Sequence, residues 1–186
     1  MKDRQEAKDA KIPLAEPSDR LDRNAREVIG AAIEVHKHLG PGFLESVYEE
    51  ALAMELSLRG ISFVRQPRVE VCYKGRIVGI GRPDFVVGGG LVVEIKALTA
   101  LGPVHQAQVI SYLKSLGTQL GLLLNFREIR MRDGIKRVVG GNPTSYRQQQ
   151  TNNMEKAREA RECFVVTRCN SSVAFEVMKK DLDAVA

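Results

Sequence analysis

The amino-acid sequence predicts a single α/β domain in which a central mixed sheet is flanked by helices. Three patterns point to this fold class: apolar helical stripes near the N-terminus, short β-type runs between glycine turns, and a further helix followed by an apolar run. The chain has 186 residues, which suits one domain with extensions and a sizeable buried core. Strand and helix patterns mixed on this scale are typical of a sheet covered by helices.

Two helices are expected before the first strand. The first contains Asn24 and Glu27, which have the spacing of a capping box, and the glycine and proline at 40–41 end it. The second is expected over about 43–59, because its apolar residues recur at helical spacing. Its inward face is expected to contain Leu44, Val47, Ala51, Leu52 and Leu56.

Four short β-type runs follow, each bounded by turn residues. They are Val69–Tyr73, Ile77–Ile80, Phe85–Val87 and Leu91–Ile95. A lysine-glycine pair at 74–75 separates the first two runs, and three glycines at 88–90 separate the last two. Such short glycine connections favour tight turns between antiparallel strands, so these runs predict a β-meander.

Another helix, a buried strand and a hairpin complete the expected domain. The helix is expected near Val104–Leu116. The run Leu120–Phe126 is apolar almost throughout, as in a strand covered on both faces. Asp133 and Gly134 then predict a turn into a last strand, Ile135–Val139.

Changes in composition divide the chain into three parts. Residues 1–21 alternate in charge and contain two prolines, which predicts a flexible N-terminal arm. Residues 22–140 hold the elements described above and form the expected domain. A polar run follows the glycines at 140–141, so residues 141–186 are expected to be a linker and a peripheral C-terminal extension.

Composition also limits the class of protein. The chain is 44% hydrophobic and 27% charged, and no apolar run approaches the roughly 18 residues of a membrane span, so no membrane association is expected. The N-terminus lacks the apolar segment of a secretory signal, and the three cysteines lack metal-type spacing, which together favour a cytoplasmic protein. The formal net charge of +5 is compatible with a polyanionic partner such as nucleic acid.

Two charged residues interrupt an otherwise apolar strand. Glu94 and Lys96 are two residues apart, so in a strand they share one face while Ile95 points to the other. One interpretation is a solvated strand face with a weak ion pair. However, the flanking residues are apolar on both faces, as in an interior strand, and a charged pair there needs a partner such as a metal or a cleft.

Asp84 adds a second acidic residue to this region. It directly precedes Phe85–Val87, and the turn at 88–90 is expected to return the chain beside it, close to Glu94. Two neighbouring carboxylates repel each other, and a divalent cation relieves that repulsion; oxygen ligands favour Mg²⁺ or Mn²⁺. Taken alone, Asp84 also fits a turn residue that follows a proline.

These three residues also match a known motif. Pro83-Asp84, followed after nine residues by Glu94-Ile95-Lys96, resembles the signature of the PD-(D/E)XK nuclease superfamily. The match depends on the order and combination of the residues, because each short motif alone is weak.

Further motifs resemble narrower groups within that superfamily. Gly81-x-x-Asp84 and Gln108-x-x-x-Tyr112 look like motifs of its RecB-like branch. The segment 42–48, GFLESVY, is similar to the motif that names the GxxExxY proteins. The arginine and proline before the aspartate depart from the dipeptide expected in that family, but this departure removes no acidic residue.

The resemblance covers about 22–139 and implies a restriction-endonuclease-like αβββαβ core. It implies that Asp84 and Glu94 are ligands of Mg²⁺ or Mn²⁺. Lys96 would orient or activate the attacking water and stabilise charge on the phosphate. Glu45 corresponds to an additional acidic residue that often completes such a site, although an acid at a helix N-terminus is also favoured by the helix dipole.

Gln108 and Tyr112 are expected to take part in the same site. They are four residues apart in a predicted helix, so their side chains share one face and both can reach one cleft. The alternative is an exposed amide and a half-buried core phenol.

The function implied is a divalent-metal-dependent nuclease that hydrolyses phosphodiester bonds in DNA or RNA. Two alternatives use the same scaffold: a non-cleaving nucleic-acid-binding or accessory protein, and a module that binds a protein partner. The presence of Asp84, Glu94 and Lys96 together favours the enzyme, because a binding module has no need for all three.

Overall fold

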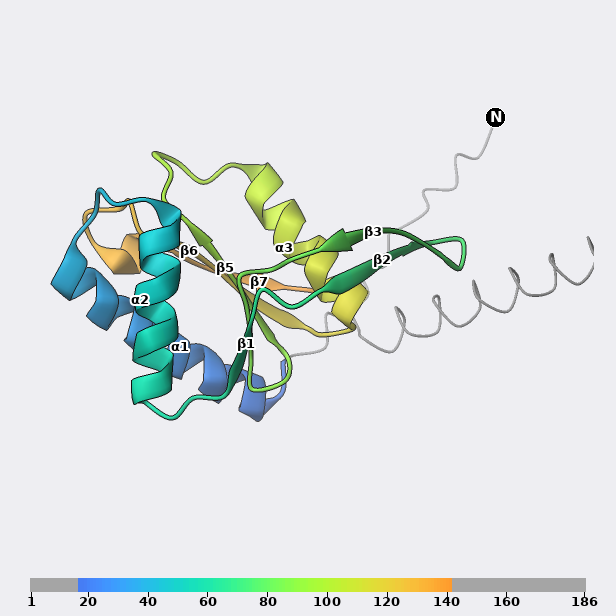
Figure 1. Cartoon of the computed structure of the whole chain (residues 1–186), viewed down its shortest axis with the longest axis horizontal. Coiled ribbons are helices and arrows are strands. Elements are labelled where there is room, and N and C mark those ends of the chain that lie inside the picture. The colour runs from blue at the N-terminus through green and yellow to red at the C-terminus, as the bar shows by residue number, and fades with distance from the viewer. Residues whose placement is uncertain (1–16, 142–186) are drawn as a thin grey trace, which may run out of the picture.

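A five-stranded mixed sheet with helices on both faces forms the centre of the molecule (Figure 1). The computed structural model describes residues 17–141. Most of the expected N-terminal arm and all but the first residue of the expected C-terminal extension therefore lie outside the described residues. The predicted fold class, a central mixed sheet flanked by helices, is confirmed.

The central strand of this sheet is β5, which has a neighbour on each side. In spatial order the strands are β1 (Phe63–Arg65), β4 (Phe85–Val87), β5 (Leu91–Lys96), β6 (Leu120–Asn125) and β7 (Ile135–Val139). Neighbouring strands are antiparallel except for β5 and β6, which are parallel because helix α3 (Pro103–Leu116) returns the chain between them. Strand β5 therefore has a hydrogen-bonded partner strand on each of its edges.

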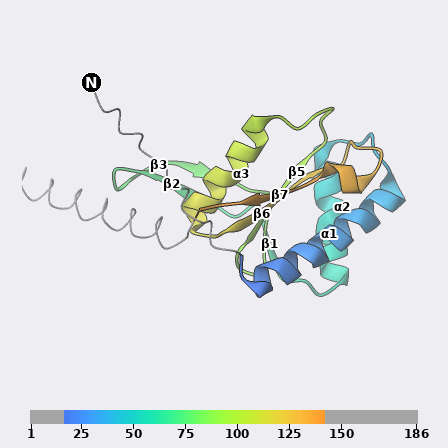
Figure 2. The same cartoon turned by 180° about the vertical axis from the view of Figure 1, so that it is seen from behind.

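Two helices, α1 (Asp19–Leu39) and α2 (Glu45–Leu58), cover one face of the sheet, as the view from behind in Figure 2 also shows. Tyr48, Leu52 and Leu56 lie four residues apart along α2 and are fully buried against this face. Burying a large apolar side chain of this kind contributes about 1.5–3 kcal/mol to stability. This layer therefore holds α2, and with it the residues at its N-terminus, against the sheet.

Helix α3 covers the opposite face. Its Val109 and Leu113 are buried against Val92 of β5 and Leu123 of β6. Gly121 permits this close approach, because a Cβ atom there would collide with the Val109 side chain. The side chains of β5 that point away from α1 and α2 therefore face α3.

Strands β2 (Val69–Tyr73) and β3 (Arg76–Gly81) form a separate two-stranded ribbon. The ribbon projects from the body on the side opposite α1 and α2 (Figure 1). The expected turn at 74–75 is present, with positive φ angles at both residues. The expectation that all four β-type runs form one meander is wrong, because β1 occupies the place beside β4 at the edge of the main sheet.

Two details of the predicted helices also need correction. Helix α1 begins at Asp19 with Ser18 as its N-cap, so Asn24 lies inside the helix and residues 19–21 do not belong to an arm. Leu44 and Val47 are exposed rather than inward. Because α2 begins at Glu45, Leu44 precedes the helix, and the buried stripe passes through Tyr48 instead.

The predictions for the strands failed at two further points. Strand β1 was not predicted, because it has three residues and two of them are exposed. Asp133 and Gly134 belong to a short 3-10 helix, Met131–Gly134, rather than to a tight hairpin turn, although β7 begins where expected. Within residues 17–141, no helix has the length and apolar character needed to cross a membrane.

Candidate functional site

Strand β5 places Glu94 and Lys96 on the face of the sheet that α3 covers. Ile95 lies between them and is buried in the opposite core with α1 and α2, as strand alternation predicts. Glu94 is only 3% exposed, and the Lys96 side chain is largely covered as well. A carboxylate and an ammonium group are therefore held side by side in the interior of the sheet.

Asp84 joins them from the neighbouring strand. It lies one residue before β4, whose antiparallel register places Phe85 opposite Val93, and this brings Asp84 beside the end of β5. Its Oδ2 atom accepts a hydrogen bond from the backbone N–H of Ile95 at 2.6 Å. The backbone of β5 thus fixes the Asp84 carboxylate next to Glu94.

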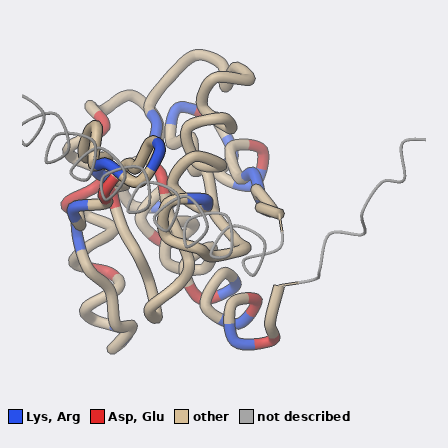
Figure 3. Tube along the Cα trace, turned by 90° about the vertical axis from the view of Figure 1, so that its right-hand side faces the viewer, with Lys and Arg blue, Asp and Glu red and all other residues tan. Residues whose placement is uncertain are grey.

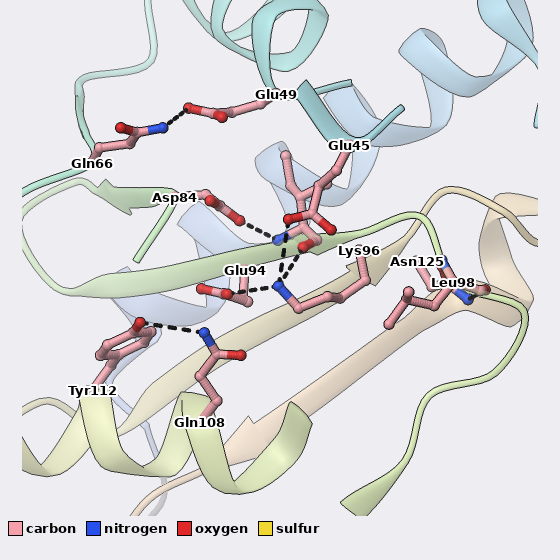
Figure 4. Close-up of polar contacts among 11 residues, drawn as sticks. Glu45, Glu49, Gln66, Asp84, Glu94, Lys96, Leu98, Gln108, Tyr112 and Asn125 are labelled. Carbon is pink, nitrogen blue, oxygen red and sulfur yellow. Dashed lines mark hydrogen bonds and ion pairs between the residues drawn. The ribbon is translucent and has the colours of Figure 1, made fainter. Parts of the chain in front are cut away.

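Lys96 connects the acidic residues. Its Nζ atom donates to Glu94 Oε1 and to the carbonyl oxygen of Ile95, each at 2.8 Å (Figure 4). It also lies 3.6 Å from Oε1 of Glu45, the first residue of α2. The Lys96 ammonium group therefore lies between the carboxylates of Glu94 and Glu45, and the charge of Asp84 also acts on it.

The charges of this group alter its acid–base behaviour. Burial, together with the charge of Glu94, raises the pKa of Asp84 to about 7. Burial also raises the pKa of Glu94, although the hydrogen bond from Lys96 opposes this. Burial alone would lower the pKa of Lys96, but its hydrogen bond with Glu94 and the surrounding negative charge raise that pKa overall. Lys96 therefore stays charged, whereas the Asp84 carboxyl group is only partly ionised near neutral pH.

Glu94 Oε2 is the atom that best indicates what the site binds. It is buried, and it has no hydrogen-bond partner in the described part of the chain. A buried carboxylate oxygen without a partner costs free energy, and a hard divalent cation would satisfy it. The oxygens of Asp84 and Glu94 are of the kind that Mg²⁺ and Mn²⁺ prefer.

The protein supplies only part of a metal coordination shell. Residues 17–141 contain no group of three or more histidine, cysteine, aspartate or glutamate side chains that could hold a metal ion. Glu45 was expected as a third ligand, but the structure brings it to Lys96, and its side chain is 44% exposed. A cation held by Asp84 and Glu94 would take its remaining oxygens from water or from a phosphate, as Mg²⁺ commonly does.

Gln108 and Tyr112 share one face of α3, as predicted. The Gln108 side-chain amide donates to the Tyr112 hydroxyl at 3.3 Å, and in the view of Figure 4 the pair lies across Glu94 from Asp84 and Glu45. The Tyr112 ring also packs against Gly81, where a Cβ atom would come within 2.6 Å of it. Tyr112 is thus partly a packing residue, while its hydroxyl and the Gln108 amide form a polar edge on α3.

The sequence did not predict one set of polar contacts that supports Asp84. Glu49 of α2 is buried, and its Oε1 atom accepts from Arg65 at 2.7 Å and from the Gln66 side chain at 2.9 Å. The backbone N–H of Gln66 in turn donates to the carbonyl oxygen of Asp84 at 2.8 Å. Glu45 and Glu49 are four residues apart and therefore share one helix face, and this spacing is the sequence feature that could have predicted that Glu49 lies near the site.

Asn125 supports the other end of the site and was also missed. It is fully buried at the end of β6, opposite Lys96 in the parallel register. Its side-chain amide accepts from the backbone N–H of Leu98 at 3.0 Å and donates to the Leu98 carbonyl at 2.8 Å. These bonds hold the chain where it leaves β5. The sequence feature that could have predicted this role is a single amide residue at the end of the apolar run of β6.

A sequence model described as the PD-(D/E)XK nuclease superfamily matches residues 22–138. The search of curated proteins found no match.

Two solved structures resemble the fold. One is an alkaline exonuclease from Laribacter hongkongensis, with 13% sequence identity and a TM-score of 0.39, over 70% of this chain and 72% of that one. The other is the same exonuclease in complex with dAMP, with 11% identity and a TM-score of 0.35, over 81% and 99% of the two chains. Both are distant likenesses.

Proposed function

Because the chain belongs to the PD-(D/E)XK nuclease superfamily, we propose that it is a divalent-metal-dependent nuclease that hydrolyses phosphodiester bonds in DNA or RNA. We further propose that it belongs to the GxxExxY group of the RecB-like branch, on the motifs around Glu45 and on α3. The observation that carries the proposal is the buried Glu94 Oε2 atom, which has no hydrogen-bond partner within residues 17–141 and lies in the same site as a second, half-buried carboxylate and a charged lysine. A purely structural ion pair gives no reason to bury a second carboxylate there.

In this proposal Asp84 and Glu94 hold Mg²⁺ or Mn²⁺. A bound ion of this kind neutralises charge on a phosphate and lowers the pKa of a bound water. The hydrogen bond from Ile95 keeps the Asp84 carboxylate aimed at the site without help from the ion. Both ligands are therefore positioned by backbone structure, at neighbouring points of adjacent strands.

Lys96 has a different role from the two carboxylates. An ammonium group cannot bind a cation, and the raised pKa keeps Lys96 protonated, so it cannot serve as a general base. It can donate hydrogen bonds to the attacking water or to a phosphate oxygen, and it stabilises negative charge that develops there. Glu45 holds the Lys96 ammonium from the side of α2.

Gln108 and Tyr112 would bind the substrate from α3. Both are half-buried, and their polar atoms already form a hydrogen bond to each other. Each can instead donate to a phosphate oxygen, and phosphate contacts of this kind fix the position of the nucleic-acid backbone. We assign them to substrate positioning.

A second function is supported by one observation. Residues 17–141 lack a group of three side chains that could enclose a metal ion. A non-cleaving nucleic-acid-binding or accessory protein would need no such group, and it would keep the same scaffold.

One experiment decides between the two functions. Purified full-length protein is incubated with labelled single- and double-stranded DNA and RNA in Mg²⁺, in Mn²⁺ or in chelator. Cleavage is expected only with metal, and it is expected to be lost in folded Asp84→Asn but kept in Glu27→Gln, which removes an exposed carboxylate from α1. If the folded parent cleaves no substrate with either metal, the accessory function is the better account.

A further inference from the structure

The β2–β3 ribbon exposes an apolar face that no part of residues 17–141 covers. Ile80 lies opposite Glu70 and Ile77 lies opposite Cys72, and the bulged residue Val78 adjoins them. Ile77, Val78 and Ile80 are 58%, 62% and 44% exposed. A ribbon that served only to connect other elements would gain nothing from three exposed aliphatic side chains.

The opposite face of the ribbon is anchored at its base. Val69 is 3% exposed, α3 packs against β2, and the paired residue Gly81 lies against the Tyr112 ring. The exposed face is thus held in a defined orientation by Tyr112, one of the residues assigned above to substrate positioning.

The ribbon is also basic. From Arg68 to Arg82 the chain has four basic side chains and one acidic side chain, a net charge of +3. The four basic residues are Arg68, Lys74, Arg76 and Arg82, and all are exposed. Figure 3 views the molecule from the end at which the ribbon projects, with basic positions in blue.

Some basic side chains of the described residues are neutralised by a carboxylate, and others are not. None of the four has an ion pair within residues 17–141. In contrast, Arg59, Arg65 and Arg137 each pair with a carboxylate. At the tip, Tyr73 is 63% exposed, Lys74 lies 5.4 Å from the centre of its ring, and Arg76 is its cross-strand partner. The tip therefore presents an aromatic ring between two cations.

The ribbon is joined directly to the candidate active site. Strand β3 ends at Gly81, and only Arg82 and Pro83 separate it from Asp84. The six residues of β3 span about 20 Å, which is longer than the roughly 12 Å width of the major groove of B-DNA. A polynucleotide whose phosphate lies at Asp84 can thus extend along the ribbon.

We propose that the β2–β3 ribbon is the arm that holds the polynucleotide substrate of this site. Its arginine and lysine side chains contact phosphates, Tyr73 stacks on a base or packs against a sugar, and the aliphatic face lies against base edges. The inference rests on the proposed function, because it assigns the ribbon to the same substrate. A second copy of the chain fits this surface less well, since two ribbons of net charge +3 repel each other.

Binding in the presence of chelator tests the arm without requiring cleavage. Fluorescence anisotropy measures the affinity of the full-length protein for labelled single-stranded and duplex oligonucleotides over a range of salt concentrations. The ribbon variant Arg68→Gln/Lys74→Gln/Arg76→Gln removes three exposed charges. The matched control, Arg23→Gln/Arg26→Gln/Lys37→Gln, removes three exposed charges from α1.

The ribbon variant is expected to bind more weakly and to depend less on salt. Each lost phosphate contact lowers the slope of log affinity against log salt by about 0.9 on a duplex and about 0.7 on a single strand. The slope should therefore fall by about 3 or about 2 in the ribbon variant and stay at the parental value in the control. Equal slopes for the two variants, or no binding by the parent, would overturn the proposal.

Two further measurements separate the remaining outcomes. The association state, measured by light scattering, should be the same in the parent and in Ile77→Ser/Val78→Ser. A parental oligomer that dissociates in this variant would assign the face to a second copy.

Tyr73→Ala leaves the charge unchanged and should weaken binding to single strands by about 5- to 150-fold. Unchanged binding would contradict the stacking role.

Failure of the arm and failure of the proposed function give different results. If the parent binds through the ribbon but cleaves nothing with Mg²⁺ or Mn²⁺, the nuclease assignment fails and the arm stands. If the parent cleaves nucleic acid and the ribbon variant binds and cleaves like the α1 control, the arm fails and the nuclease assignment stands.

Discussion

The backbone N–H of Gln66 donates a hydrogen bond to the carbonyl oxygen of Asp84 at 2.8 Å. Gln66 adopts a positive φ angle of 45°, which is uncommon for a residue with a side chain. Its side chain is bound by Glu49, whose carboxylate also accepts from Arg65. Helix α2 is thus linked to the Asp84 backbone through the buried carboxylate of Glu49, and we expect Glu49 to position Asp84.

The role of Glu49 can be separated from a general loss of acidic charge. Glu49→Ala leaves the donors of Arg65 and Gln66 without a buried partner, so it is expected to lower the free energy of unfolding by about 1–3 kcal/mol and to weaken Mn²⁺ binding. Glu50→Ala is the matched control, because Glu50 is exposed and pairs with the same arginine. Its effect should stay within about 0.5 kcal/mol.

Urea denaturation and calorimetry with Mn²⁺ measure the two effects. Equal Mn²⁺ affinities in folded Glu49→Ala and Glu50→Ala would show that Glu49 supports the fold but does not position Asp84.

The pKa of Asp84 predicts how stability without metal depends on pH. Since this pKa is raised to about 7, the folded state binds more protons than the unfolded state between about pH 4 and pH 7. The free energy of unfolding contributed by this group therefore falls as the pH rises through that window. Asp84→Asn removes the ionisable group but keeps an oxygen that can accept from Ile95, so it should stabilise the protein more near pH 8 than near pH 5.

Denaturation of both proteins in chelator at the two pH values provides the measurement. The same change in stability at both values would mean that Asp84 titrates at an ordinary pKa. Because a metal competes with the proton on Asp84, Mn²⁺ affinity of the parent should also weaken as the pH falls below about 7.

The residues on α3 are expected to affect substrate use and not metal binding. Gln108→Ala and Tyr112→Phe remove hydrogen-bonding groups without altering Asp84 or Glu94, so KM should rise while Mn²⁺ affinity stays at the parental value. Ser111→Ala, on an exposed part of the same helix, serves as the control. Loss of folding in both variants, seen by circular dichroism, would instead favour a packing role for this pair.

The described residues define a candidate independent domain. Residues 17–141 contain two apolar clusters and a five-stranded sheet, and α1 begins with its own N-cap at Ser18. We expect a fragment of residues 17–141 to unfold cooperatively with a midpoint close to that of the full chain. A fragment that fails to fold would show that residues outside 17–141 are needed for stability.

Local patterns in the sequence predicted much of the fold and of the site. The alternation along β5 placed Glu94 and Lys96 on one face and Ile95 on the other, because side-chain direction in a strand follows from spacing alone. The spacing of Gln108 and Tyr112 likewise predicted a shared helix face.

The missed features depend on contacts between distant parts of the chain. Whether β2 and β3 join the main sheet is decided by β1, a three-residue strand with too few residues for a clear pattern. Glu49 supports Asp84 only because α2 packs where it can reach Gln66. The exposure of Leu44 follows from where α2 begins, which a propensity pattern leaves uncertain by a few residues.

Variants of Lys96 and Glu94 can distinguish a catalytic residue from a metal ligand. Both lie on one face of β5 and are hydrogen-bonded to each other, but only Glu94 can bind a cation. Lys96→Ala should keep Mn²⁺ binding, whereas Glu94→Gln should lose it. Both variants must first be shown to be folded, because breaking a buried ion pair can cost about 3–5 kcal/mol.

The proposed role of Lys96 is tested most simply by the rate at which folded Lys96→Ala cleaves a labelled oligonucleotide in Mn²⁺, relative to the parent. A positioned group that assists proton transfer or stabilises charge typically contributes about 10²- to 10⁴-fold in rate. We expect the cleavage rate of Lys96→Ala to fall by a factor of about that size, with Mn²⁺ affinity retained. Cleavage at the parental rate by the folded variant would contradict that role.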